Sequence, residues 1–329
     1  MTTLLDVWNL QTHFFTRDGV AKAVDGVSFT LEKGQILGLV GESGSGKSVT
    51  GFSILGLVDP PGRVVGGQIL FDGADLVSGG EGAMRHLRGK RIAMIFQDPM
   101  MTLNPVLRID TQMVETVRAH ENVSHTEALR RARAALVQVG ISSPDERLQS
   151  YPHQFSGGMR QRVAIAIALL HKPDLIIADE PTTALDVTIQ AQILSEVQNL
   201  CAKSGTALIW ITHDLAVVSG LADRLAVMYA GRIIEEGPTA EIIANPRHPY
   251  TRGLIDSVPQ GKRHGAMLTQ IKGMTPSLLK LPQGCKFAPR CPRADQDCQV
   301  EPLLEPAGAN RNVRCHHPHS EAAAKVSAS

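Results

Sequence analysis

A glycine-rich segment near the N-terminus constrains the fold of this chain more than any other feature. It reads Gly41-Glu42-Ser43-Gly44-Ser45-Gly46-Lys47-Ser48 and follows an apolar run over 35–40 that predicts a buried strand. Helically spaced Phe52, Leu55 and Val58 come after it and predict a helix that continues to Val58. A strand, a G-x-x-x-x-G-K-S turn and a helix start together indicate a phosphate loop.

The chemistry of such a loop follows from its residue types. Glycines let the backbone wrap tightly, so that N–H groups converge on an anion at the helix N-terminus. Lys47 then reaches the β- and γ-phosphates, and the Ser48 hydroxyl ligates Mg²⁺. The alternative is a glycine-rich turn that binds nothing, and the presence of both Lys47 and Ser48 argues against it. We therefore predict a nucleoside triphosphate site formed by Gly41, Glu42, Ser43, Gly44, Ser45, Gly46, Lys47, Ser48 and Val49.

The composition limits the classes of partner. The 329 residues are 43% apolar and 20% charged, which is ordinary for a soluble globular protein. A net charge of +1 gives no electrostatic reason to bind nucleic acid or an anionic membrane, and 4% aromatics argues against base stacking. No apolar run approaches the ~18 residues of a membrane span, and the first residues lack the pattern of a secretion signal. We expect a cytosolic protein that reaches any membrane through a partner.

Strands alternate with helices after the phosphate loop, as in an α/β sheet. Apolar runs predict buried strands at 92–96, 175–178 and 207–211, and polar residues end them. These are Gln97, Asp179-Glu180 and Thr212-His213-Asp214. Because ligands bind at the carboxyl edge of such sheets, we expect the site there.

A helical insert is predicted between the two halves of the nucleotide site, over about 111–149. Its best-marked helix starts at a capping box, Ser124-His-Thr-Glu127, and Gly140 ends it. Leu129, Ala132, Leu136 and Val139 form its apolar stripe. Further on, 224–228 and 232–236 predict a closing hairpin, and prolines punctuate the region after a boundary near 240.

Two adjacent carboxylates, Asp179 and Glu180, follow the strand over 175–178. Downstream of a phosphate loop, the first can hold the Mg²⁺ shell and the second can orient or deprotonate the attacking water. Acidic pairs at strand ends also act as helix caps, which is the structural alternative.

Six motifs occur in the order found in ATP-binding cassette (ABC) subunits, which this chain resembles over about 4–240. They are residues 41–48, Gln97, Ser156-Gly157-Gly158, residues 175–180, Ala184-Leu185-Asp186 and His213. The resemblance implies an α/β P-loop NTPase cassette with a parallel core sheet, an N-terminal antiparallel β subdomain and an α-helical subdomain at about 107–172.

The resemblance also implies a role for each motif. Gln97 senses the γ-phosphate and Mg²⁺ and links them to a membrane partner, and His213 contacts the γ-phosphate. The Ser156-Gly157-Gly158 signature contacts ATP bound to a second subunit, and Asp186 crosses the interface between the two. The Mg²⁺ set is then Ser48, Gln97 and Asp179, with Glu180, His213 and Gln97 as catalytic residues.

The chain departs from the family pattern at two places. Met159 stands where many members have Gln, and no Tyr occupies the usual adenine-stacking position. Phe14 or Phe15 could stack on adenine in its place, although aromatic residues also fill cores.

A narrower resemblance joins this chain to the ATPase subunits of peptide, nickel and opine importers. The segments Gln97-Asp-Pro-Met-Met-Thr-Leu-Asn-Pro105 and Asn245-Pro-Arg-His-Pro-Tyr-Thr-Arg252 carry it, and residues 179–192 add to it. Within this subfamily the chain resembles in particular the first ATPase subunit of dipeptide importers. The resemblance implies a second homologous ATPase subunit, two transmembrane permease subunits and an external peptide-binding protein, on the cytoplasmic face of a bacterial inner membrane. Nickel, glutathione or opine import is the alternative within the subfamily.

Four of the five cysteines fall in the C-terminal region and form C-x5-C-x6-C-x16-C: Cys285, Cys291, Cys298 and Cys315. A reducing cytosol argues against disulfides, and zinc sites usually contain C-x2-C pairs, which this pattern lacks. Four thiolates suit an iron–sulfur cluster. His316 and His317 keep a mixed Zn²⁺ site open, and ordinary buried cysteines are the third possibility. Importer ATPases that this chain resembles can carry a structural 4Fe-4S cluster here.

We expect a cassette over 1–240, an importer-type extension over 241–319 and a tail over 320–329. An ATPase subunit that drives peptide uptake is the leading hypothesis. A soluble cassette ATPase for repair or translation is the alternative from another class, although such proteins usually carry two cassettes or a long coiled coil.

Overall fold

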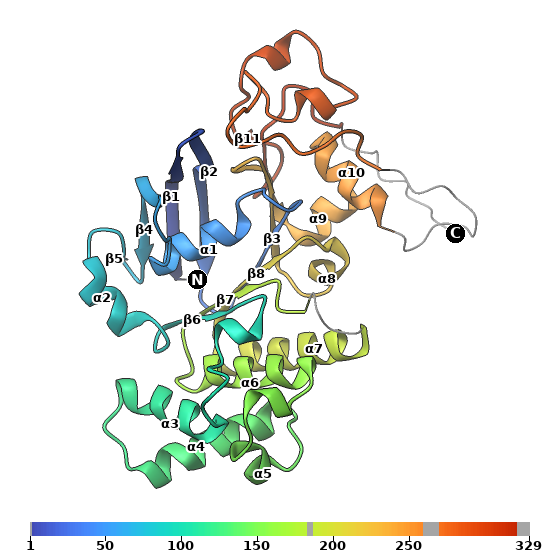
Figure 1. Ribbon diagram of the computed structural model, residues 1–329. Helices are drawn as coiled ribbons and strands as arrows, with labels where there is room; N and C mark the ends of the chain where they lie inside the picture. The colour runs from blue at the N-terminus through green and yellow to red at the C-terminus, as the bar shows by residue number, and fades with distance from the viewer. Residues whose placement is uncertain (1, 183–186, 259–269, 321–329) are drawn as a thin grey trace, which may run out of the picture.

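The computed structural model of the protein describes residues 2–182, 187–258 and 270–320. Within these ranges a mixed eight-stranded sheet crosses the molecule (Figure 1). In spatial order its strands are β11 (Glu305–Pro306), β12 (Asn312–Val313), β10 (Arg232–Pro238), β9 (Arg224–Tyr229), β3 (Ile36–Val40), β8 (Ala207–Thr212), β7 (Leu175–Asp179) and β6 (Ile92–Ile95).

The strands from β9 to β6 are parallel, and β10, β12 and β11 continue the sheet antiparallel. All residues of β3, β7 and β8 are buried, which explains why each reads as a continuous apolar run. The predicted core strands and the hairpin of β9 and β10 are confirmed.

A second, antiparallel sheet lies at the N-terminal side. Within the described residues its strands, in order, are β2 (Gly19–Glu32), β1 (Thr3–Thr16), β4 (Gly62–Phe71) and β5 (Ala74–Asp75). Strands β1 and β2 are 14 residues each and pair along their length with register shifts, and they form the antiparallel β subdomain that the family resemblance implies. Their alternating apolar residues form a core with the helix α1 (Lys47–Leu55) and with the main sheet.

The helix after the phosphate loop is shorter than predicted. It ends at Leu55, because Gly56 takes a left-handed conformation with φ +61° and donates its N–H to the Ser53 carbonyl. Val58 therefore lies outside the helix, and the predicted extension to Val58 is wrong.

The helical insert is found at the end of the molecule opposite the C-terminal segment (Figure 1). The apolar stripe of the helix α4 (His125–Gln138) packs as predicted, and Gly140 follows this helix with φ +70°. Half of the capping box forms: Ser124 Oγ accepts from the Glu127 N–H at 3.2 Å, but the Glu127 carboxylate pairs with Arg130 and Arg131 instead. The insert comprises α3 (Ile109–His120), α4 and α5 (Pro144–Leu148), and the helix α6 (Gly157–Leu169) follows it.

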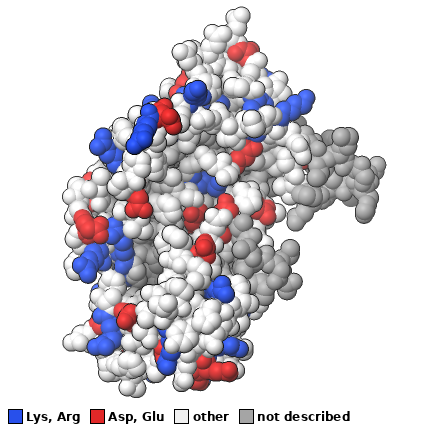
Figure 2. Space-filling view, in the orientation of Figure 1, with Lys and Arg blue, Asp and Glu red and all other residues white. Residues whose placement is uncertain are grey.

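The remaining helices connect these parts. They are α2 (Gly80–Leu87), α7 (Val187–Ser204), α8 (Leu215–Ser219), α9 (Thr239–Ala244) and α10 (Pro249–Ser257), with short 3₁₀ turns η1 (Pro99–Met101), η2 (Pro152–Gln154), η3 (Ala288–Arg290) and η4 (Asp297–Gln299). No helix in the described ranges is long and apolar enough to cross a membrane. On the face seen in Figure 2, Lys and Arg are scattered among Asp and Glu.

The segment after residue 240 packs on the same core as the main sheet. The rings of Tyr229 on β9 and Tyr250 on α10 lie 4.7 Å apart, and Phe287 contacts both. Although prolines punctuate this region, the helix α10 begins at Pro249, a residue well suited to the first turn of a helix.

A fully buried carboxylate joins this segment to the sheet. Glu235 on β10 is 0% exposed, and it accepts hydrogen bonds from the Arg247 and His248 N–H groups at 2.8 and 3.0 Å. Arg311, whose side chain is 4% exposed, neutralises it through an ion pair. The extension therefore depends on a charge pair that water does not solvate.

We predict that Arg311→Met lowers the free energy of unfolding by about 3–5 kcal/mol, because it strands a buried carboxylate. Urea denaturation followed by circular dichroism measures this. The matched control is Arg130→Met, which breaks the ion pair of Arg130 with Glu127. Because the Arg130 side chain is 67% exposed, this change should lower the free energy of unfolding by less than about 1 kcal/mol. Equal losses in the two variants would contradict the assigned role of Arg311.

Candidate nucleotide-binding site

The phosphate loop is held closely by its neighbours. It leaves β3 at Gly41 and enters α1 at Lys47, with Gly46 as N-cap at φ +103°. A Cβ atom at Gly46 would lie 2.2 Å from the Ala23 carbonyl oxygen, so only glycine fits. The Gly231 N–H donates to the Ser45 carbonyl at 2.9 Å, which ties the loop to the hairpin of β9 and β10.

Lys47 folds back over the loop. Its Nζ donates to the carbonyl oxygens of Gly41 and Glu42 at 2.8 and 3.0 Å, and the residue is 5% exposed. Burial lowers the pKa of Lys47, while the carboxylates of Glu180, Asp179 and Glu42 act in the opposite direction. The ammonium group thus lies where an incoming phosphate could replace backbone carbonyls as its partner.

The predicted Mg²⁺ ligands lie at the adjoining strand ends. Ser48 Oγ donates to Asp179 Oδ1 at 2.9 Å, and Gln97 follows β6 on the same side. Burial raises the pKa of Asp179, and the nearby Glu180 adds to this rise, while Ser48 and Lys47 oppose it. Hydroxyl, amide and carboxylate oxygens are the donors that Mg²⁺ prefers, so these residues fit the ion.

Glu180 and His213 form a pair at the centre of the site. Glu180 Oε2 lies 3.2 Å from His213 Nδ1, and Glu180 has a left-handed backbone with φ +43°. Such a conformation is costly for a residue with a side chain, and its own N–H is held by the Ile211 carbonyl at 2.9 Å. This backbone fixes where the carboxylate points.

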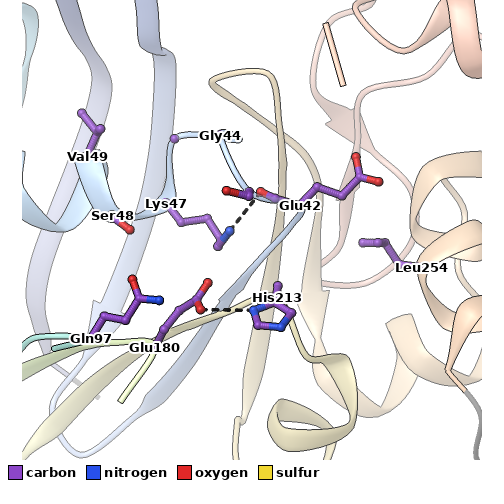
Figure 3. Close-up of a pocket in the computed structure, with 11 residues that line it drawn as sticks. Glu42, Gly44, Lys47, Ser48, Val49, Gln97, Glu180, His213 and Leu254 are labelled. Atoms are coloured by element: carbon purple, nitrogen blue, oxygen red, sulfur yellow. Dashed lines mark hydrogen bonds and ion pairs between the residues drawn. The ribbon is translucent and has the colours of Figure 1, made fainter. Parts of the chain in front are cut away.

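These groups open onto one cavity of about 570 Å³. Figure 3 shows Lys47, Glu180 and His213 directed into it, with Gln97 beside Glu180. Its lining is Glu42, Ser43, Gly44, Gly46, Lys47, Ser48, Val49, Gln97, Glu180, His213 and Leu254. The predicted convergence of the phosphate loop with the strand-end residues is therefore observed.

Other predicted residues lie elsewhere. Ser156, Gly157 and Gly158 begin α6 and are not in the lining of this cavity, and Ser156 is exposed with its Oγ accepting from the Met159 N–H at 3.4 Å. Asp186 lies outside the described residues. Phe15 is 40% exposed beneath the Arg63 guanidinium, and neither it nor Phe14 lines the cavity, so adenine stacking stays a prediction.

Sequence reasoning missed the contribution of the C-terminal segment. Leu254 on α10 lines the cavity, and Glu42 is bonded to Tyr250, Thr275 and Arg290. Pro249 could have predicted the helix that carries Leu254, but no local pattern reveals contacts between residues this far apart in sequence.

All four C-terminal cysteines are free thiols, and Cys298 is buried while Cys285, Cys291 and Cys315 are partly exposed. The Cys285 N–H donates to the Cys298 carbonyl at 2.9 Å. Burial raises the pKa of Cys315 to about 11, and the other three thiols add to the rise. Cys201, by contrast, is buried in the main core on α7.

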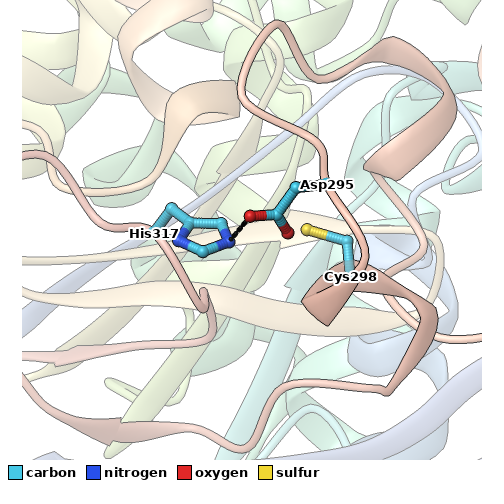
Figure 4. A group of neighbouring side chains, drawn as sticks. All are labelled: Asp295, Cys298 and His317. Carbon is cyan, nitrogen blue, oxygen red and sulfur yellow. Dashed lines mark ion pairs between the residues drawn. The ribbon is translucent and has the colours of Figure 1, made fainter.

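One group of candidate metal ligands within the described residues combines a single one of these cysteines with two other residue types. Asp295, Cys298 and His317 place one ligand atom each within 4.8 Å of one another (Figure 4). The His317 Nε2 to Asp295 Oδ2 distance is 2.8 Å. A four-cysteine metal site thus remains a prediction.

The arrangement of phosphate loop and strand-end carboxylates is that of a P-loop ATPase, and solved structures narrow the class. One similar structure is a dimer of the ATP-binding cassette MJ0796 bound to ADP and Pi. The match covers 72% of the present chain and 99% of the MJ0796 chain, with a TM-score of 0.66 and 25% sequence identity. The structure of cbiO1 from Clostridium perfringens, part of the ABC transporter complex cbiONQ, gives TM-score 0.62 with 27% identity over 74% and 92% of the two chains. The fold is that of an ATP-binding cassette.

Sequence comparison identifies the family. Residues 24–183 match the ABC transporter family, and residues 234–298 match the oligopeptide/dipeptide transporter C-terminal region. The oligopeptide transport ATP-binding protein AppD of Bacillus subtilis is 49% identical over 96% of this chain and 97% of its own length. The dipeptide transport ATP-binding protein DppD of Bacillus subtilis is 52% identical over 96% of this chain and 95% of its own length. The oligopeptide transport ATP-binding protein OppD of Salmonella typhimurium is 46% identical over 97% of this chain and 95% of its own length. The chain belongs to the ATPase subunits of ABC transporters that carry this C-terminal region.

We predict that Glu180→Gln leaves ATP affinity intact and lowers ATP hydrolysis at least ~10²-fold, because an amide cannot accept a proton from water. Phosphate release and calorimetric ATP binding by the full chain measure the two effects. Lys47→Ala should instead weaken ATP binding, whereas Lys33→Ala, which removes an exposed lysine, should change neither. Undiminished turnover in Glu180→Gln would exclude Glu180 as the base.

Proposed function

We propose that this chain hydrolyses ATP to drive the import of di- or oligopeptides through a membrane complex. One observation carries the proposal: the relatives named for peptide transport match over nearly the whole chain, including the segment after the cassette. The chain would act as a peripheral subunit on the cytoplasmic face of a bacterial inner membrane.

In the proposed mechanism the loop amides and Lys47 bind the β- and γ-phosphates. Ser48, Gln97 and Asp179 would hold Mg²⁺, which supplies positive charge to the phosphate oxygens. Glu180 accepts a proton from the water whose oxygen attacks the γ-phosphorus, and the bond from that phosphorus to the ADP oxygen breaks. His213, 3.2 Å from Glu180, orients the carboxylate and approaches the γ-phosphate.

A second ATPase subunit completes the proposed site. Ser156, Gly157 and Gly158 stand at an outward N-terminus of α6, a 13-residue helix whose positive end could face the γ-phosphate held by the partner. Asp186 would cross the same interface. Closure of the two subunits would push on two transmembrane permease subunits, and an external peptide-binding protein would deliver the substrate.

We also propose the division of the chain. The cassette would span 1–240 with its helical subdomain at 107–172, and the extension would span 241–319. The tail over 320–329 lies mostly outside the described residues. Nickel, glutathione or opine import with the same ATPase role is the alternative, and a soluble cassette ATPase has no sequence feature in its favour.

We predict that wild-type chain restores uptake of a labelled dipeptide in cells that lack the gene but retain the membrane subunits. Ser156→Arg should abolish uptake, because a bulky cation at the helix start blocks closure, while ATP affinity of the purified subunit stays near wild type. Ser150→Arg is the control, because it introduces the same cation at a serine outside the Ser156-Gly157-Gly158 motif, and it should leave uptake intact. Rescue of Ni²⁺ or glutathione uptake in place of the dipeptide would reject peptide as the substrate, and loss of ATP binding in Ser156→Arg would reject the two-subunit site.

For the C-terminal cysteines we propose a structural 4Fe-4S cluster held by Cys285, Cys291, Cys298 and Cys315. Support comes from their gathering in one segment and from the preference of such clusters for four thiolates. The group of Asp295, Cys298 and His317 favours a mixed Zn²⁺ site as the second candidate.

We predict that anaerobically purified protein is brown, with broad absorbance near ~400 nm from thiolate-bound iron and sulfide. Cys291→Ser should remove the absorbance, and Cys201→Ala, a change at a buried cysteine outside the segment, should leave it. Metal analysis decides between the two sites, because stoichiometric zinc without iron would overturn the cluster.

A further inference from the structure

One residue of the phosphate loop is held by the C-terminal segment. The Glu42 N–H donates to Tyr250 Oη at 2.9 Å. The Glu42 carboxylate accepts from Thr275 Oγ1 at 2.9 Å and from Arg290 Nη1 and Nη2 at 2.6 and 3.0 Å. Backbone and side chain of the same loop residue are therefore both fixed by residues beyond the cassette.

Arg290 is well placed to hold this carboxylate. Its side chain is 5% exposed, and its Nε donates to the Lys272 carbonyl at 3.1 Å. The guanidinium carbon lies 5.8 and 6.0 Å from the ring centroids of Tyr229 and Phe287. Both of its terminal nitrogens bond Glu42 in a charge-assisted fork, which gives this largely buried pair a defined geometry.

The position of the Glu42 carboxylate matters because triphosphate binds nearby. Glu42 lines the cavity with Lys47, and Figure 3 shows its side chain turned away from the Lys47 ammonium. Burial raises the pKa of the Glu42 carboxyl, but the hydrogen bonds from Arg290 and Thr275 outweigh this and hold the pKa below its usual value. The Glu42 carboxylate is therefore a negative charge within a loop that binds anions.

We propose that Arg290 is a positioning residue for ATP binding, which holds the Glu42 carboxylate away from Lys47 and neutralises it. Without Arg290 the carboxylate is free to pair with Lys47 and to repel the incoming phosphates. ATP affinity then depends on the folded C-terminal segment, and so on the region of Cys291, the next residue. This inference rests on the proposed ATP-hydrolysing function.

Measurements of ATP binding and turnover on variants of the full chain test this. Arg290→Gln should raise the Kd for Mg²⁺-ATP, measured by calorimetry, about tenfold, the size expected for loss of a charge-assisted contact. The turnover number at saturating ATP should stay within about twofold, because the arginine does not contact the reacting atoms. The Kd of Arg290→Lys should lie between those of wild type and Arg290→Gln, since lysine keeps the positive charge but cannot form the two-nitrogen contact.

The decisive variant is Arg290→Gln combined with Glu42→Gln. If the arginine acts by restraining a carboxylate, removal of that carboxylate restores the Kd to within about threefold of wild type. Arg293→Gln, an exposed arginine of the same segment, is the matched control with wild-type affinity. Thr275→Val removes one hydrogen bond to Glu42 and keeps Arg290, so it should raise the Kd by a smaller factor. This variant still tests the proposal if Arg290→Gln does not fold.

The proposal is overturned if the double variant binds ATP as weakly as Arg290→Gln, which would make the arginine a purely structural residue. An unchanged Kd in both Arg290→Gln and Thr275→Val would overturn it as well. Failure of the proposed function is distinguishable, because then wild-type protein would itself neither bind nor hydrolyse ATP.

Discussion

The phosphate loop runs so close to two strands that its shape is set by them. A Cβ at Gly41 would lie 2.2 Å from the Met228 carbonyl oxygen on β9, and one at Gly46 equally close to Ala23 on β2. The loop therefore packs tightly between the main sheet and the antiparallel sheet. This packing sets the positions of Lys47 and Ser48, and so of the cavity, because α1 begins at Lys47, where the loop ends.

The region that follows the cassette belongs to the same physical unit. Tyr229, Tyr250 and Phe287 pack edge to face, and Glu235 is neutralised by Arg311 across two segments. Buried charges of this kind are satisfied only when both segments are folded together. The nucleotide site thus depends on residues from both ends of the chain.

Much of the site could be predicted because its residues are marked by local patterns. The strands β7 and β8 are continuous apolar runs that end in polar residues, and their parallel pairing brings Glu180 and His213 together. Other features follow from tertiary contacts that no local pattern reveals. Glu42 and Arg290 are separated by 248 positions, and Glu127 pairs with nearby arginines rather than with the helix start that its spacing predicts.

The pairing of β12 with β10 has a consequence for attempts to isolate the cassette. Asn312 and Val313 form ladder pairs with Glu236 and Glu235, so the C-terminal segment covers the outer edge of the strand β10. A chain cut near residue 240 would present that edge with unpaired backbone N–H and C=O groups. Exposed edges of this kind pair with other chains, so a truncated cassette would tend to self-associate through β10. By pairing with β10, the extension would therefore also limit self-association of the cassette.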